Sequence, residues 1–152
     1  MVENEPELRE FLVEAKQNTY AGNGREKESC RPSSKDLPYQ KGKYYYLDSY
    51  IGASHFIGEE VVWHDGRILW GMNYYGELLA PQAPAGFAEF LKDALRRCTP
   101  ERPFRGPRDY AAGGFEYCCE AAGDLGSFMG EERVSHGGAI VYRLRFHGGY
   151  LR

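Results

Sequence analysis

Apolar residues recur every three or four positions in two separate parts of the chain, a spacing typical of amphipathic helices. They are Leu8, Phe11, Leu12 and Ala15 in the first part, and Phe87, Phe90, Leu91 and Ala94 in the second. Pro6 suits the first turn of one helix, and Pro100 stops the other. We therefore predict two helices and expect their apolar faces to form one side of the core.

Three runs with alternating side chains, as in strands, follow each of these helices. The runs cover about 43–51, 55–64 and 67–75 in the first part and about 115–122, 127–136 and 139–147 in the second. Asp65-Gly66 and Gly137-Gly138 separate the second and third run of each set, and such pairs favour two-residue hairpin turns. The polar segment 22–38 is interpreted as a long loop.

The two parts are also similar in sequence. With a shift of 72 positions and no gap, residues 42–79 match residues 114–151 at 12 of 38 positions, including Phe-x-Gly-Glu-Glu at 56–60 and at 128–132. Such self-similarity is the mark of an internal repeat. We predict an α+β fold in a single domain, 1–152, with repeat one at about 5–80 and repeat two at about 84–152. Each repeat would be a helix plus a three-stranded antiparallel meander, related to the other by a pseudo-twofold axis.

The hairpin turn also predicts which side chains share a face of the sheet. A two-residue loop at Asp65-Gly66 places Glu59 opposite Met72, on the face that carries Trp70. By the same reasoning Glu131, and not its neighbour Glu132, faces inward in the second repeat. Two inward carboxylates among aromatic rings are the most unusual feature of this predicted face.

These residues form the candidate site. Carboxylates in an aromatic pocket attract cationic or aromatic small molecules through charge and cation–π contacts. The proposed ligand-binding residues are Glu59, Trp70, Met72, Tyr74, Asp48, Glu131 and Tyr142. Polar differences between the repeats place a specific site mainly on the first one.

Three alternatives stay open for these residues. One is a small hydrolase or isomerase that uses Glu59 or Asp48 as a general acid or base. Another is a protein-interaction module built on the aromatic strands. In the third, Glu59 is a structural residue paired with an arginine.

Composition and motifs exclude several classes of protein. The net charge of −3 gives no basic surface for nucleic acid. No apolar stretch is long enough for a membrane span, and the acidic first thirteen residues lack the basic start of a signal peptide, so we expect a cytoplasmic protein. The four cysteines and four histidines show no metal-ligand spacing. Nucleotide-binding and nucleophile motifs are missing too, so no metal or cofactor is expected and binding is favoured over catalysis.

Several segments together resemble a family of prokaryotic domains of unknown function, some of which follow a Cro/C1-type helix-turn-helix. The segments are RPSSKDL at 31–37, DSY at 48–50, FIGEEVVW at 56–63, MNYYG at 72–76, FRGP at 104–107 and HGG at 147–149. The resemblance implies ligand sensing with a helix-turn-helix partner. In architecture the predicted repeats are also similar to gyrase-inhibitory-protein-like effector domains, which bind ligands between two pseudo-symmetric halves.

Overall fold

The computed structural model describes residues 4–152, and these residues form two helices and one eight-stranded antiparallel sheet. In chain order the elements are α1 (Glu5–Asn18), β1 (Lys35–Lys41), β2 (Tyr44–Gly52), β3 (His55–His64), β4 (Arg67–Leu78), α2 (Phe87–Leu95), β5 (Asp109–Ala112), β6 (Phe115–Asp124), β7 (Ser127–His136) and β8 (Ala139–Tyr150). The predicted α+β class with an antiparallel sheet is confirmed.

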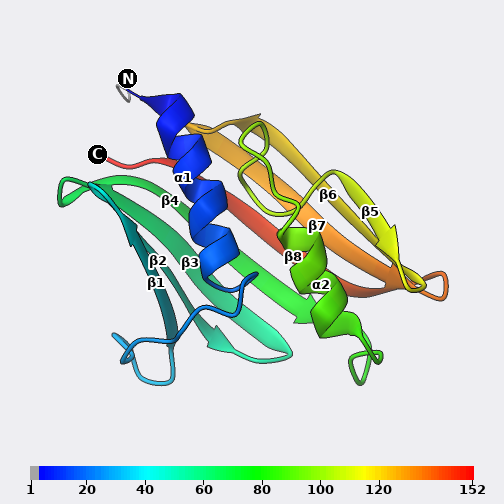
Figure 1. Cartoon of the computed structure of the whole chain (residues 1–152). Helices are drawn as coiled ribbons and strands as arrows, with labels where there is room; N and C mark the ends of the chain where they lie inside the picture. Colours follow the sequence, from blue (N-terminus) through cyan, green and yellow to red (C-terminus); the bar gives the residue numbers. More distant parts are fainter. Residues whose placement is uncertain (1–3) are drawn as a thin grey trace.

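The strands lie in the order β1-β2-β3-β4-β8-β7-β6-β5, so that the last strand of each half meets the other at the middle of the sheet (Figure 1). Each half is a meander of four strands, one more than the sequence predicted. The extra strands are β1 and β5, at the two edges of the sheet. β1 begins inside the segment interpreted as a loop and contains Pro38, and β5 is only four residues long. Both features weaken a strand pattern in the sequence and suit an edge strand.

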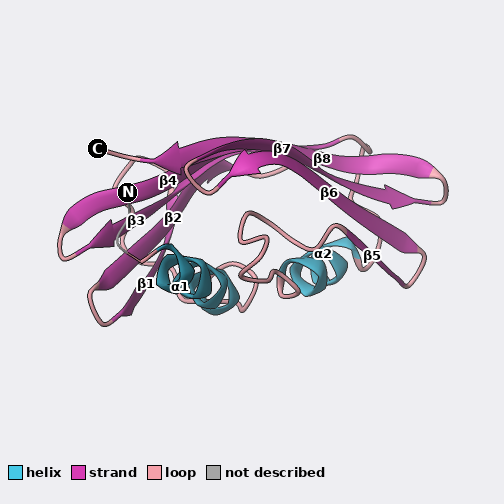
Figure 2. Ribbon diagram, turned by 90° about the horizontal axis from the view of Figure 1, so that it is seen from above, coloured by secondary structure: helices cyan, strands magenta, loops and turns pink. Residues whose placement is uncertain are grey.

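Both helices pack on the concave face of the curved sheet (Figure 2). The side chain of Asn4 accepts a hydrogen bond from the backbone N–H of Glu7 and caps α1, and Pro6 lies in its first turn. The predicted apolar face of α1 is buried, as are Phe90, Leu91 and Ala94 of α2. Phe87 is only half-buried, because it lies in the first turn of α2 beside a cavity. The helix side of the core is therefore close to the prediction.

The inner face of the sheet supplies the rest of the core. Its fully buried large side chains include Tyr46, Trp70, Met72, Tyr117 and Leu144. Burying an apolar side chain of this size stabilises the fold by roughly 1.5–3 kcal/mol. The indole Nε1 of Trp70 donates to the carbonyl oxygen of Leu125 at 3.1 Å, so its one polar atom has a partner.

The two hairpin turns lie where the sequence predicted them, but each hairpin contains an extra residue beyond the turn. Val62 pairs with Trp70 and Trp63 pairs with Ile68, which leaves Leu69 unpaired as a β-bulge. The hairpin of β7 and β8 has the same irregularity at Val141, between the pairs Val134 with Tyr142 and Ser135 with Ile140.

The bulges reverse the predicted orientation of the glutamates. Glu60, not Glu59, pairs with Met72 and is 2% exposed on the inner face. Glu132, not Glu131, is 0% exposed in the second half. The prediction that Glu59 and Glu131 point inward is wrong, because one added residue in a strand transfers every side chain beyond it to the opposite face.

Candidate functional site

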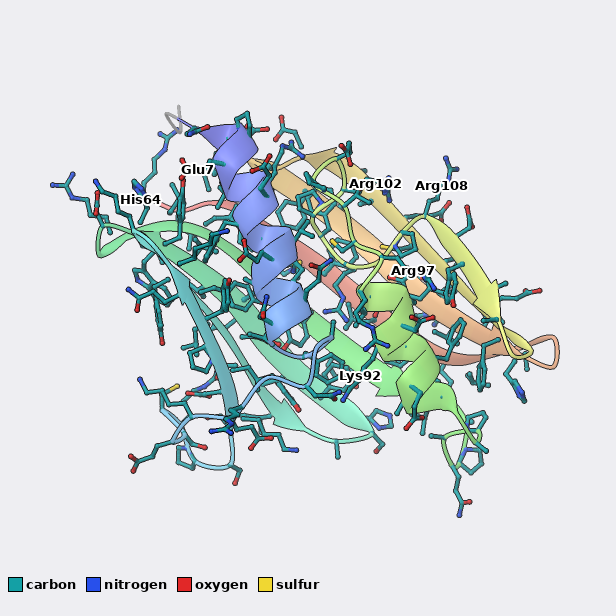
Figure 3. All side chains as sticks on the ribbon, in the orientation of Figure 1. Glu7, His64, Lys92, Arg97, Arg102 and Arg108 are labelled. Carbon is teal, nitrogen blue, oxygen red and sulfur yellow. The ribbon has the colours of Figure 1, made fainter. Side chains whose placement is uncertain are left out.

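Five charged side chains meet beneath the helices, on the inner face of the sheet. Lys16 comes from α1, Asp48 from β2, Glu60 from β3, Glu132 from β7 and Arg105 from the segment between α2 and β5. All four residues on helices and strands are less than 9% exposed. Other charged residues, such as Glu7, Arg97 and Arg108, are exposed at the surface instead (Figure 3). The five residues that meet beneath the helices are called the buried charge cluster.

Glu132 has a complete set of hydrogen bonds. Arg105 donates from Nε to Oε2 at 3.2 Å and from Nη2 to Oε1 at 3.0 Å. The hydroxyl groups of Tyr117 and Tyr142 donate to the same two oxygens at 2.6 and 3.1 Å. Such a two-pronged arginine–carboxylate contact fixes both side chains. Burial, together with the negative charge of Glu132, raises the pKa of both tyrosines, so they remain hydrogen-bond donors.

Glu60 is paired with Lys16 and also lies near the guanidinium of Arg105. The Lys16 Nζ donates to Oε2 of Glu60, and Arg105 Nη1 is 3.7 Å from Oε1. Although burial disfavours its charge, the surrounding carboxylates hold the pKa of Arg105 well above its usual range. Arg105 thus lies between the corresponding glutamates of the two halves and binds both.

Asp48 is the carboxylate without a cation of its own. The hydroxyl of Tyr74 donates to its Oδ1 at 2.6 Å, and among residues 4–152 it has no salt bridge within 4.0 Å. Burial, and then the negative charge of Glu60, raises the pKa of Asp48 to about 7, although Tyr74, Arg105 and Lys16 oppose this. Three carboxylates share two cations in the buried charge cluster, so one negative charge is left unbalanced whenever Asp48 is ionised.

A cavity of about 450 Å³ adjoins this end of the cluster, and Asp48 and Arg105 both line it. Its other walls are mainly aromatic. The rings are those of Tyr20, Tyr50, Phe56, Tyr74, Phe87 and Tyr142. A second space of about 20 Å³, also lined by Asp48 and Arg105, has room for one water molecule. We call the larger space the concave cavity.

The opposite face of the sheet carries a more open groove of about 930 Å³. Glu59 and Glu131 both line it, together with the exposed side chains of Ile57 and Met129. Glu131 is surrounded by arginines, the nearest of which is Arg145 with Nε 3.1 Å from Oε2. We call this the outer groove.

The structure separates the residues of the predicted site into three groups. Asp48, Tyr74 and Tyr142 line the concave cavity, and Tyr74 lines the outer groove as well. Glu59 and Glu131 lie in the outer groove, because of the bulges. The remaining two, Trp70 and Met72, are buried in the core and line neither space.

Sequence reasoning missed Lys16, Arg105 and the inward role of Glu60. For Lys16 a signal was present, because it follows Leu8 and Leu12 at intervals of four and so extends the buried face of α1. Arg105 gave no such signal, because its segment, FRGP at 104–107, has no helix or strand pattern. Arg31 differs from Arg105, because Arg31 lies on the outer face and donates to Ser49 at 2.6 Å.

The described residues also bear on metal binding, free thiols and membrane insertion. Within 4–152 no group of three or more His, Cys, Asp or Glu side chains is placed to hold a metal ion. Cys98 and Cys119 are buried free thiols, Cys118 is half-buried, and Cys30 is exposed. Over the same residues, none of the helices has the length and apolar character needed to cross a membrane.

Comparison with known proteins identifies the family of the chain. No curated protein and no solved structure matches it. A family model described as "Domain of unknown function (DUF5680)" matches residues 48–151, which include most of the sheet, α2 and four of the five residues of the buried charge cluster. The chain therefore belongs to the DUF5680 family.

Proposed function

We propose that this domain binds a small aromatic molecule in the concave cavity, with a positively charged or N–H group of the ligand directed at Asp48. The observation that carries the proposal is a buried carboxylate without its own cation at the end of an aromatic cavity. A group of this kind is costly to keep inside a protein unless it has a partner. A ligand that brings a donor or a positive charge supplies that partner.

The walls of the cavity suit a flat, aromatic ligand. Phe56 stacks with Tyr142 at a centroid distance of 6.4 Å and meets Tyr74 edge-on at 6.1 Å, so the rings already present both faces and edges. Aromatic faces attract cations, and the effect is strongest where water is excluded. The unbalanced negative charge of the buried charge cluster acts in the same direction.

We also infer that the two halves arose from one repeated unit and that only the first kept the ligand site. In support, the halves have the same strand order, a bulge at the same place and a buried glutamate in each. Asp48 and Tyr74 pair with Glu60 and Gly58, whereas Cys119 and Phe146 hold the same places beside Glu132 and Gly130 in the second half. The second half therefore lacks the carboxylate and the hydroxyl. The sensing role and the helix-turn-helix partner implied by the family resemblance remain part of this proposal.

Binding of a planar fluorescent cation tests the proposal directly. We expect proflavine to bind the full chain and Asp48→Asn to weaken its binding at least tenfold, as removal of a charged partner does. Glu59→Gln is the matched control, because Glu59 belongs to the outer groove. If Glu59→Gln weakened binding and Asp48→Asn did not, the ligand site would be the outer groove and the proposal would be wrong.

A second pair of variants tests the location by shape. Ala83 is an exposed residue on the wall of the concave cavity, whereas Ala88 is exposed on α2 and lines none of the cavities described above. Ala83→Trp should fill the cavity and abolish proflavine binding, and Ala88→Trp should leave it unchanged. Equal binding by both variants would place the ligand elsewhere.

One observation favours the catalytic alternative for the same cavity. A carboxyl whose pKa is near neutral can both accept and donate a proton at physiological pH, which suits general acid–base catalysis. A hydrolase or isomerase would turn over a bound aromatic substrate, and Asp48→Asn would abolish turnover while still allowing substrate to bind. Loss of binding itself supports the sensing role instead.

A further inference from the structure

The hydrogen bonds of Arg105 leave one of its nitrogens available. Nε and Nη2 are both directed at Glu132. Nη1 is 3.7 Å from the nearest oxygen of Glu60, beyond hydrogen-bond distance, and it has no hydrogen bond to any of residues 4–152. A guanidinium carries five N–H donors, and the contacts with Glu132 use only those on Nε and Nη2. Arg105 lines the concave cavity, so a ligand there can supply the missing acceptor.

Asp48 offers the complementary group beside it. Its Oδ1 accepts from Tyr74, whereas its Oδ2 accepts no hydrogen bond from the described part of the chain. Asp48 and Arg105 line the concave cavity together, and they also line the small space next to it. Asp48 and Arg105 therefore present an acceptor and a donor to a ligand in the concave cavity, whose lining also includes Tyr20, Lys35 and Tyr50.

We propose that the concave cavity selects aromatic ligands that carry a cyclic amide edge, with an N–H that donates to Asp48 and an adjacent C=O that accepts from Arg105. This inference rests on the proposed function and names the class of ligand. Lactam rings fused to an aromatic ring have this edge, as do the oxo forms of heterocyclic bases. Their planar rings match the aromatic walls of the cavity.

The charges near Arg105 favour a ligand with a neutral acceptor over a ligand with an anionic one. Glu132 and Glu60 already lie against its guanidinium, at 3.0 and 3.7 Å. A ligand carboxylate would add a fourth negative charge to the buried charge cluster, whose cations are two. A neutral carbonyl satisfies Nη1 without that repulsion. A simple amine, in turn, satisfies Asp48 but leaves Nη1 without an acceptor.

Three bicyclic probes of similar size separate these cases in the unaltered full chain. Isoquinolin-1(2H)-one has both the N–H and the C=O, 2-methylisoquinolin-1-one lacks the N–H, and 1,2,3,4-tetrahydroisoquinoline is a cationic amine without the C=O. We expect NMR-detected titration to show that the first binds at least tenfold more tightly than either of the others. Sites built to hydrogen-bond a group reject analogues that lack it.

The outcomes distinguish this inference from the proposed function. If tetrahydroisoquinoline binds as tightly as isoquinolin-1(2H)-one, the cavity is an aromatic-cation site and the cyclic-amide inference is overturned. If none of the three binds up to millimolar concentration while proflavine binds, the inference also fails but the proposed function stands. If proflavine fails as well, both are wrong.

A conservative substitution at Arg105 tests the donor itself. Arg105→Lys keeps the positive charge beside Glu132 but loses the guanidinium fork, so the preference for isoquinolin-1(2H)-one over tetrahydroisoquinoline should disappear. Arg102→Lys is the control, because Arg102 donates to the carbonyl oxygen of Cys119 at 3.0 Å and lines neither space. If Arg105→Lys retains the preference, Arg105 does not contact the ligand. The ranking of the three probes in the unaltered chain decides the matter if this variant does not fold.

Discussion

Replacing Asp48 with asparagine should remove a large part of the pH dependence of stability. The folded state holds the pKa of Asp48 at about 7, against an ordinary value of 3.8 in the unfolded chain. The folded protein therefore binds one more proton than the unfolded chain between these values, and its stability falls as pH rises through this window. The groups facing Asp48 are Glu60, Lys16, Arg105 and Tyr74.

The size of the change in stability follows from the difference between the folded and unfolded pKa values of Asp48. A difference of about three pH units corresponds to about 4 kcal/mol, since each unit is worth 1.36 kcal/mol. About 3 kcal/mol of this lies between pH 5 and pH 8. Asparagine stays neutral throughout and still accepts from Tyr74. Relative to the unaltered protein, Asp48→Asn should therefore become about 3 kcal/mol more stable as the pH rises from 5 to 8.

Urea denaturation at the two pH values measures this difference. Asp109→Asn serves as the control, because Asp109 is an exposed carboxylate on an edge strand, and its pH dependence should match that of the unaltered protein. If Asp48→Asn and the unaltered protein lose stability in parallel between pH 5 and pH 8, Asp48 is not a buried acid and the charge argument for the ligand site is refuted.

Further substitutions test the packing around the site. Phe90→Ala should cost roughly 3–5 kcal/mol because the ring is buried, and a melting temperature unchanged within two degrees would contradict that placement. Arg105→Met should cost about 3–5 kcal/mol by leaving Glu132 without a cation, and adding Glu132→Met should recover part of the loss in urea denaturation. Gly58→Ala should cost about 1–3 kcal/mol because its Cβ would clash with the hydroxyl of Tyr74, and unchanged stability would show that the ring moves freely.

The sequence predicted the elements of the fold better than their register. Helical spacing identified the buried faces around Leu12 and Phe90, and Asp65-Gly66 located a hairpin, because each of these signals is local. The bulge at Leu69 was not predictable, because an apolar residue at that position fits the strand pattern with or without it. One unrecognised residue was enough to exchange Glu59 for Glu60 on the inner face.

The candidate site was predicted in part for a related reason. Tyr74 and Tyr142 were found because they lie on strands with clear alternation. Arg105 lies in an irregular segment, and only the folded chain brings it between Glu60 and Glu132. The sequence also could not show that Asp48 has no cation of its own. That depends on how two cations are shared among three carboxylates in the folded chain.

The way the halves share Arg105 has a consequence for chain cleavage. The middle of the sheet is the pairing of β4 with β8, from Trp70 with Tyr150 to Leu78 with Tyr142, and a single guanidinium spans the glutamates on either side. A cut within 79–86 would expose one long strand edge on each fragment. It would also separate Glu60 from the guanidinium of Arg105. Neither fragment should fold by itself, yet mixing them should restore the domain. This junction is thus a natural place to split the protein into two pieces whose reassembly reports on their proximity.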